Sequence, residues 1–170
     1  ASAVGARALA KRDVLPTRLS AVDEAATMDV LCADKTGTLT RNELGVTSLH
    51  PMPGFDVAHL IVFAALASSD GGQDPVDTAI RAAAQGKSIP DSPQLLTFTP
   101  FDPATKRSEA TVAGPGGGTQ RIVKGAFAVV SDLAQPSADA AAAGSELETQ
   151  GFRVLAVAAG VPAAFRRVGL

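Results

Sequence analysis

The residues best suited to chemistry lie in one short string, DKTGTLT, at positions 34–40. The string follows a brief apolar run at 30–33, which we predict to be a buried strand because it is short, partly β-branched and bounded by polar residues. Asp34 would then lie at the end of that strand, where open α/β sheets bind their ligands. A carboxylate followed by a lysine, threonine hydroxyls and a turn-forming glycine indicates phosphoryl transfer with Asp34 as the nucleophile.

The string also resembles the phosphorylation motif of P-type ATPases, the ion pumps that form an aspartyl-phosphate from ATP. This resemblance implies a catalytic site made of Asp34, Lys35 and Thr36, with Mg²⁺ bound at Asp34 and Thr36. Lys35 and the metal would relieve the repulsion between the carboxylate and the phosphate. The alternative is that Asp34 starts an ordinary turn in which Thr36 and Thr38 make local hydrogen bonds. That alternative explains each residue singly, whereas the complete string favours phosphorylation.

The residue two places after the nucleophile decides what happens to a phosphorylated aspartate. In the related phosphatases of the haloacid-dehalogenase class this residue is usually a second aspartate, which serves as general acid and base. Here it is Thr36, so water would be poorly activated and the aspartyl-phosphate should persist. A persistent intermediate suits a protein that changes shape between phosphorylation and hydrolysis. A soluble phosphatase of the haloacid-dehalogenase class is the alternative function.

A second group of candidate residues lies in four later segments that resemble the nucleotide-binding domain of P-type ATPases and follow its order. The segments are DPVDTAI at 74–80, FDPATKRS at 101–108, VKGA at 123–126 and GFRVLAVA at 151–158. The resemblance implies an ATP site formed by Asp74, Asp77, Phe101, Lys106, Ser108, Lys124, Gly125 and Arg153.

The chemistry of these residues suits a nucleotide. Adenine needs a flat apolar partner, and Phe101 is predicted at a strand end before a proline-containing turn, where its ring can be exposed. Lys106, Lys124 and Arg153 would offer cations from three strands to a polyphosphate. Gly125 would let the backbone approach the base closely.

Four of these residues also have an explanation that needs no ligand. Asp77 could accept a hydrogen bond from the adenine amino group, but Asp74 and Asp77 are also favourable residues at the start of a helix. A lone phenylalanine such as Phe101 is normally part of the core. Lys106 and Arg107 could be solvated charges on an edge strand. The common order of the four segments favours the nucleotide site.

The periodicity of apolar residues predicts the elements that must position these side chains. We expect helices over 1–12, 20–28 (with Ser20 in a capping box), 56–69, 74–86, 126–134 and 137–150. We expect strands over 30–33, 44–48, 94–100, 107–113, 119–124, 152–159 and 164–168. This order predicts the α/β fold class, with a fragment of parallel α/β structure followed by an α+β unit whose sheet is mainly antiparallel and flanked by helices.

The resemblance divides the chain into two domains. Residues 1–42 would be a linker helix and the N-terminal piece of a haloacid-dehalogenase-like, Rossmann-type phosphorylation domain. Residues 43–170 would form the nucleotide-binding domain. The glycine-rich stretch at 114–118 opens into a predicted strand, so we expect an exposed connector there and no phosphate-binding loop.

The composition bounds the function further. The 170 residues carry 15 basic and 17 acidic side chains, a net charge of −2, which implies no general affinity for nucleic acid. The single cysteine, Cys32, cannot form an internal disulfide, and we predict a buried structural role for it in a reducing, cytosolic setting. No stretch of the sequence is long and apolar enough to cross a bilayer, so the chain taken alone is expected to be soluble.

The resemblance is greatest to the plasma-membrane class of proton-pumping P-type ATPases, through LPTRLSAVDE at 15–24 and FTPFDP at 98–103. It implies a parent hydrolase and translocase at the cytoplasmic face of the plasma membrane. The implied partners are ATP and the rest of the pump, namely the remaining phosphorylation domain, the actuator domain and the membrane helices. Their motifs do not occur in these 170 residues. We therefore expect this chain to bind ATP without turnover, and nothing in it selects the ion.

Overall fold

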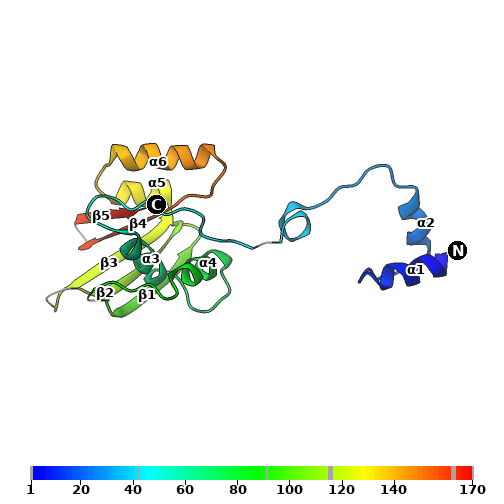
Figure 1. Cartoon of the computed structure of the whole chain (residues 1–170), viewed down its shortest axis with the longest axis horizontal. Coiled ribbons are helices and arrows are strands. Elements are labelled where there is room, and N and C mark those ends of the chain that lie inside the picture. Colours follow the sequence, from blue (N-terminus) through cyan, green and yellow to red (C-terminus); the bar gives the residue numbers. More distant parts are fainter. Residues whose placement is uncertain (1, 42, 91, 115–116, 162–163, 170) are drawn as a thin grey trace. The chain divides into compact units, whose positions relative to one another are not determined.

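The computed structural model describes residues 2–41, 43–90, 92–114, 117–161 and 164–169. The chain divides into two compact units, Ala1–Asn42 and Glu43–Leu170 (Figure 1). The first unit contains helices α1 (Ser2–Ala10) and α2 (Ser20–Ala26) and a single π-helical turn, η1 (Lys35–Leu39). These two helices confirm the ones predicted at 1–12 and 20–28.

The predicted buried strand at 30–33 is wrong. Val30 and Leu31 are 70% and 75% exposed, and the segment forms no strand. A strand needs a neighbour to satisfy its backbone N–H and C=O groups, and the described part of this unit contains no other strand. Cys32 is exposed for the same reason, so the prediction that it is buried is also wrong.

The predicted capping role of Ser20 is wrong as well. The residue at the N-cap of α2 is Leu19, and its side chain makes no capping hydrogen bond. The backbone N–H groups of Ala21 and Val22 donate to the carbonyls of Arg18 and Leu19, both at 3.2 Å. The tight turn therefore begins before Ser20, and the N–H of Val22, which a Ser20 cap could have bonded, already has a backbone partner.

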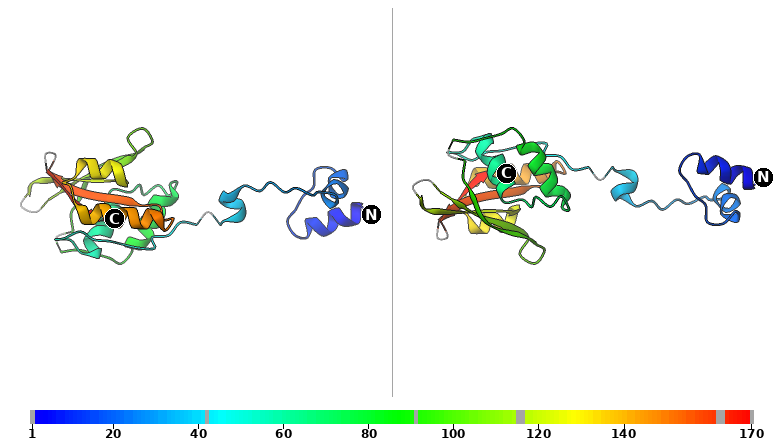
Figure 2. Two further views of the ribbon diagram at one scale, coloured as in Figure 1. Left: turned by 90° about the horizontal axis from the view of Figure 1, so that it is seen from above. Right: turned by 90° about the horizontal axis from the view of Figure 1, so that it is seen from below.

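The second unit is built on a five-stranded antiparallel sheet in the order β1-β2-β3-β4-β5. Its strands are β1 (Leu95–Asp102), β2 (Arg107–Ala113), β3 (Thr119–Ala126), β4 (Leu155–Val161) and β5 (Ala164–Gly169). Its helices are α3 (Val57–Leu66), α4 (Pro75–Ala84), α5 (Phe127–Leu133) and α6 (Ala138–Thr149). The predicted mainly antiparallel sheet with flanking helices is confirmed. The turn between β1 and β2 projects away from the helices in both views of Figure 2.

The sheet has an apolar core on each face. Ile122 belongs to the core with α3 and α4, whereas its neighbour Val123 belongs to the core with α5 and α6. Both are fully buried, and because successive side chains alternate along β3 they point to opposite faces of the sheet. The two helix pairs therefore cover opposite faces of the sheet, and Lys124, the buried charged residue of β3, lies on the same face as Ile122.

The starts of α3 and α4 follow from their capping residues. Asp56 accepts a hydrogen bond from the backbone N–H of His59 at 2.8 Å. Asp74 accepts from the N–H groups of Val76 and Asp77 at 2.8 and 3.4 Å, and Pro75 occupies the first turn. The predicted start of α4 is confirmed, and the cap fixes where Asp77 lies.

The predicted strand at 44–48 is wrong. Residues 43–50 form no regular secondary structure, and the chain joins the sheet only at Pro51, which pairs with Gly169. The next N–H, that of Met52, donates to the carbonyl of Val168 at 2.9 Å. Pairing with β5 thus begins after the predicted segment, and Glu43–Leu49 lies instead along a pocket. No helix in the described part of the chain is both long and apolar enough to span a membrane.

Candidate functional site

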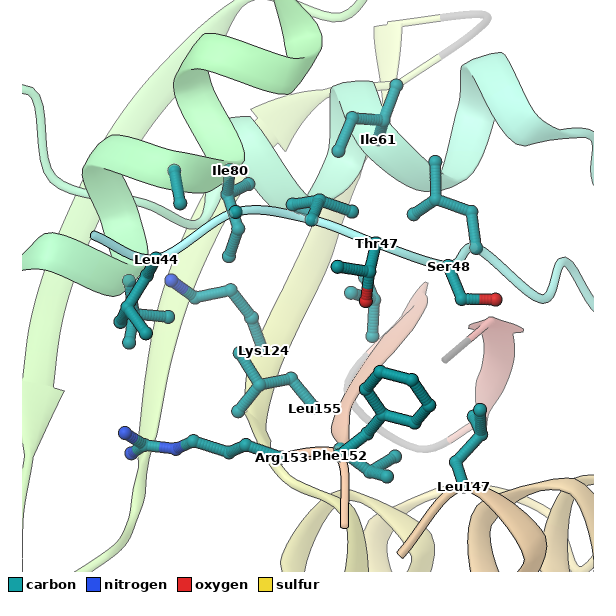
Figure 3. Close-up of a pocket in the computed structure, with 18 of the residues that line it drawn as sticks. Leu44, Thr47, Ser48, Ile61, Ile80, Lys124, Leu147, Phe152, Arg153 and Leu155 are labelled. Atoms are coloured by element: carbon teal, nitrogen blue, oxygen red, sulfur yellow. The ribbon is translucent and has the colours of Figure 1, made fainter. Parts of the chain in front are cut away.

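The second unit contains a pocket of about 500 Å³, within the usual size range of small-molecule sites (Figure 3). One wall is the extended segment Glu43–Leu49, which we call the strap. The other walls come from α3, α4, the end of α6 and the start of β4. Its apolar lining is Leu44, Val46, Leu49, Leu60, Ile61, Ala64, Val76, Ala79, Ile80, Leu147, Phe152, Val154, Leu155 and Val157. Such walls suit a flat apolar group.

Two of the predicted cations line this pocket, Lys124 and Arg153. Lys124 comes from β3 and is only 3% exposed. Arg153 is exposed and lies in the loop before β4, because that strand begins at Leu155 and does not reach back to 152 as predicted. Figure 3 shows both side chains reaching toward the same end of the pocket. The arginine is thus a solvated cation at the pocket and the lysine a buried one.

The ammonium of Lys124 is paired with the carboxylate of Asp77. Lys124 Nζ donates to Asp77 Oδ1, and the two side chains are 4% and 5% exposed. Asp77 Oδ2 accepts from the backbone N–H of Ser69 at 2.8 Å, and Ser68 Oγ accepts from Lys124 Nζ at 2.8 Å. A buried ion pair offsets its lost hydration only when its remaining donors and acceptors find partners, and these two serines supply them.

The local sequence explains how these charges meet. The Asp74 cap starts α4, which places Asp77 in its first turn, facing the sheet. Lys124 lies two residues after Ile122 on β3, so both point to the α3 and α4 face. Asp74 itself is committed to the cap through its Oδ1, so it supports the site from one turn away.

Phe101 and Lys106 lie near the turn between β1 and β2 and do not line the pocket. Phe101 is 41% exposed, which agrees with the predicted exposed ring. Lys106 is exposed and has a positive φ of 52°. Its carbonyl accepts from the N–H of Ala126 at 3.1 Å, which ties the turn to the end of β3. The predicted contacts of both side chains with a nucleotide stay predictions.

Gly125 has a structural reason to lack a side chain. A Cβ at this position would lie 2.4 Å from the carbonyl oxygen of Lys106 and 2.9 Å from the Cα of Arg107. Glycine therefore lets the β1–β2 turn pack on β3 directly beside Lys124. Gly125 was predicted to let a base approach, whereas the close approach in the structure is that of the chain's own backbone.

Ser108 is fully buried in β2. Its hydroxyl donates to the carbonyl of Ala67 at 2.7 Å and to that of Lys124 at 3.4 Å. These bonds give Ser108 a packing role beneath α3, on the strand beside Lys124.

The phosphorylation string in the first unit is less constrained. Asp34 is exposed, precedes η1, and makes no capping hydrogen bond with its side chain. The turn itself is closed by Thr40, whose N–H and hydroxyl donate to the Lys35 carbonyl at 3.1 and 3.2 Å, and by Gly37 with a φ of +78°. Lys35 is exposed, and the side chain of Thr36 lies outside the described residues.

Sequence reasoning missed Ser68, Ser69, Phe152 and the strap as parts of the site. Two serines directly after an apolar helix are a visible signal for capping. The contact of Ser68 with Lys124 is not visible in the sequence, because the two residues are 56 positions apart.

No protein-family profile matches the chain. It is 36% identical over 163 residues to a putative cation-transporting ATPase of Methanocaldococcus jannaschii, which covers 92% of this chain and 20% of the relative. It is also 36% identical over 170 residues to a plasma membrane ATPase of Neurospora crassa, which covers 92% of this chain and 18% of the relative. The chain belongs to the P-type ATPase family. It spans about a fifth of the length of these curated relatives.

Solved structures of P-type ATPases share the fold. One structure of a zinc-transporting PIB-type ATPase matches with a TM-score of 0.57 and 26% identity over 80% of this chain and 20% of that one. A second structure of a zinc-transporting PIB-type ATPase, in a different state, matches with a TM-score of 0.64 and 24% identity over 97% of this chain and 25% of that one. The antiparallel sheet with flanking helices is therefore the α+β fold of this part of P-type ATPases.

Proposed function

We propose that this chain is the ATP-binding portion of a P-type cation-transporting ATPase and that its parent protein hydrolyses ATP. The observation that carries the proposal is the pocket with apolar walls, a buried Lys124–Asp77 pair and the exposed cation Arg153. An adenine ring suits the apolar walls, and the arginine fork suits phosphate oxygens. Because Asp77 balances the charge of Lys124, we place this lysine near the base and Arg153 near the phosphates.

In the parent, Asp34 would attack the terminal phosphoryl group of ATP. A bond forms between a carboxylate oxygen and phosphorus, the bond to the bridging oxygen breaks, and ADP leaves with the electron pair. The exposed carboxylate of Asp34 has no competing cap bond, so it is available for this step. Lys35 lies next to it and would balance developing charge.

A magnesium ion fits this arrangement. Mg²⁺ commonly binds one or two carboxylates and completes its shell with substrate phosphates and water. Asp34 supplies one such carboxylate, and in the described ranges no three His, Cys, Asp or Glu side chains gather into a larger metal site. Asp34, together with Thr36, would hold the ion, which would neutralise charge on the phosphates.

The transported cation is proposed to be the proton, from the likeness of 15–24 and 98–103 to the plasma-membrane class and from relatives called plasma membrane ATPases at 34–36% identity. The partners of this chain would then be the rest of the phosphorylation domain, the actuator domain and the membrane helices. This portion would face the cytoplasm.

An amide-resolved NMR titration with a non-hydrolysable ATP analogue, with and without Mg²⁺, tests the proposal directly. We expect shifts at Asp77, Lys124, Gly125 and Arg153, with Asp34 largely unchanged. A titration that moves none of the residues around the pocket would refute nucleotide binding by this chain. Strong Mg²⁺-dependent shifts around Asp34 would instead show that this chain assembles a phosphorylation site without the rest of the protein.

A further inference from the structure

The corner that follows α3, Ser68–Ser69, holds both members of the buried ion pair. Ser68 Oγ accepts from Lys124 Nζ at 2.8 Å, and the N–H of Ser69 donates to Asp77 Oδ2 at 2.8 Å. Neither serine belongs to the lining of the pocket in the part of the chain that the structure describes. Two adjacent residues outside the pocket therefore hold the Lys124 ammonium, which lines the pocket, and the Asp77 carboxylate that is paired with it.

The hydroxyl of Ser68 has a defined direction. It donates its single proton to the carbonyl of Ala64 at 2.7 Å, one helical turn earlier. Its lone pairs are then left for Lys124, to which it can only be an acceptor. Ser68 is 4% exposed, so it is poorly accessible to water that could replace this contact. The position of the ammonium is thus set from the end of α3.

The corner is itself held in place. Arg81 on α4 donates to the carbonyls of Ala65 and Ser68, both at 3.4 Å, and Ser108 on β2 donates to the carbonyl of Ala67 at 2.7 Å. Ala65 lies in the last turn of α3, and its carbonyl also accepts from the backbone N–H of Ser68 at 3.1 Å, whereas Ala67 and Ser68 follow the end of the helix and their carbonyls accept from these side chains. Contacts from two elements make Ser68 a fixed acceptor.

A lysine ammonium has three N–H donors. Among the described residues, those of Lys124 reach two acceptors, Asp77 Oδ1 and Ser68 Oγ, and Lys124 also lines the pocket. We propose that Ser68 is a positioning residue, which directs the third N–H of Lys124 into the pocket and so sets the affinity for a ligand that it does not touch. The ligand part of this inference rests on the proposed nucleotide site.

The first test needs no ligand. A buried, hydrogen-bonded ammonium exchanges its protons slowly, so the ¹H–¹⁵N signal of Lys124 Nζ should be visible by NMR at neutral pH. We expect Ser68→Ala to remove or strongly shift this signal and Ser68→Thr, which keeps the hydroxyl, to restore it. The matched control is Ser131→Ala, because Ser131 Oγ also donates to a carbonyl one turn earlier, that of Phe127, at 2.7 Å. That control should leave the signal unchanged.

The second test measures nucleotide affinity by titration of the same variants. We expect Ser68→Ala to weaken ATP and adenosine alike by roughly tenfold, the change that corresponds to one hydrogen bond to a charged group. In a Lys124→Met background, Ser68→Ala should have no further effect. If Ser68→Ala does not fold, Ser68→Cys keeps a similar volume with a weaker acceptor and serves in its place.

The outcomes of these tests distinguish the positioning role of Ser68 from the proposed nucleotide-binding function. The positioning role of Ser68 is overturned if the Lys124 signal is unchanged in Ser68→Ala. It is also overturned if the unsubstituted chain shows no slowly exchanging Lys124 signal, and both results hold whichever ligand is bound. A lost signal in a chain that binds no nucleotide supports the position of Lys124 and refutes the proposed function. A tenfold loss that persists in the Lys124→Met background shows that Ser68 acts by another route and also overturns the inference.

Discussion

The two units of this chain differ in how strongly sequence and structure constrain them. The phosphorylation string at 34–40 is the most specific motif of the sequence, yet Asp34 is exposed and its side chain has no capping bond. The pocket of the second unit has weaker motifs, yet its Lys124–Asp77 pair is buried and held by two further hydrogen bonds. A reactive group can be recognised from a local motif even where the structure places few contacts around it. A binding site depends on contacts between segments that are distant in the sequence, and a local motif does not reveal these.

The replacement Asp34→Asn should have the largest effect, and the effect should depend on which protein carries it. In the complete pump we expect total loss of the acid-stable phosphoprotein formed from γ-labelled ATP, because the nucleophile is gone. In this chain alone we expect no label before or after the replacement, and unchanged nucleotide affinity. Label on Asp34 in this chain would contradict the contrast between the two units.

The replacement Asp77→Ala should have the next largest effect, this time on the second unit. It leaves the ammonium of Lys124 buried without its counter-ion, which typically costs about 3–5 kcal/mol of the free energy of unfolding. Urea denaturation measures this change. The matched control is Glu109→Ala, which breaks the ion pairs of Glu109 with Arg107 and Arg121 at a better solvated site.

We expect the control to cost at most about 1 kcal/mol. Equal losses in the two variants would show that the Lys124–Asp77 pair is no more constrained than the partly exposed pairs of Glu109. The contrast between the buried site and the exposed string would then lose its main support.

Much of the fold could be predicted because its signals are local. Asp74 and Pro75 predict the start of α4, and alternating residues around a glycine-rich loop predict the β2–β3 hairpin. The failures at 30–33 and 44–48 have one cause. Both segments have the composition of strands, but a strand forms only where another backbone is available to pair with it.

The site was predicted in part for a related reason. Lys124 and Arg153 line one pocket, and Asp77 is paired with Lys124, while the contact of these residues with a nucleotide stays a prediction. The strap and the Ser68–Ser69 corner belong to no motif, and their contacts join residues far apart in the chain. Phe101 was predicted as the stacking ring, yet the ring that lines the pocket is Phe152.

The replacement Phe101→Ala sharpens that last difference. Loss of a base–aromatic stack should reduce nucleotide affinity by about 1–3 kcal/mol, measured by titration with a non-hydrolysable ATP analogue. Phe152→Ala is the matched variant, since the two rings are 41% and 44% exposed. If Phe152→Ala weakens binding and Phe101→Ala does not, the base lies in the pocket and the assignment of Phe101 is wrong.

The smallest expected effect concerns pH and the start of α3. The backbone N–H of His59, and then its ring, donate hydrogen bonds that lower the pKa of Asp56 below its usual value. A carboxyl whose pKa is lower in the folded state contributes stability above its unfolded pKa, and that stability is lost as the pH falls through the folded pKa. The first turn of α3 should therefore fray in acid while the sheet persists.

A carbon-detected NMR titration of Asp56 checks the shift in its pKa, and His59→Gln separates the causes of that shift. Because the backbone bond is the larger cause, we expect the pKa in His59→Gln to rise only part of the way, and a full return to the usual value would assign the effect to the ring.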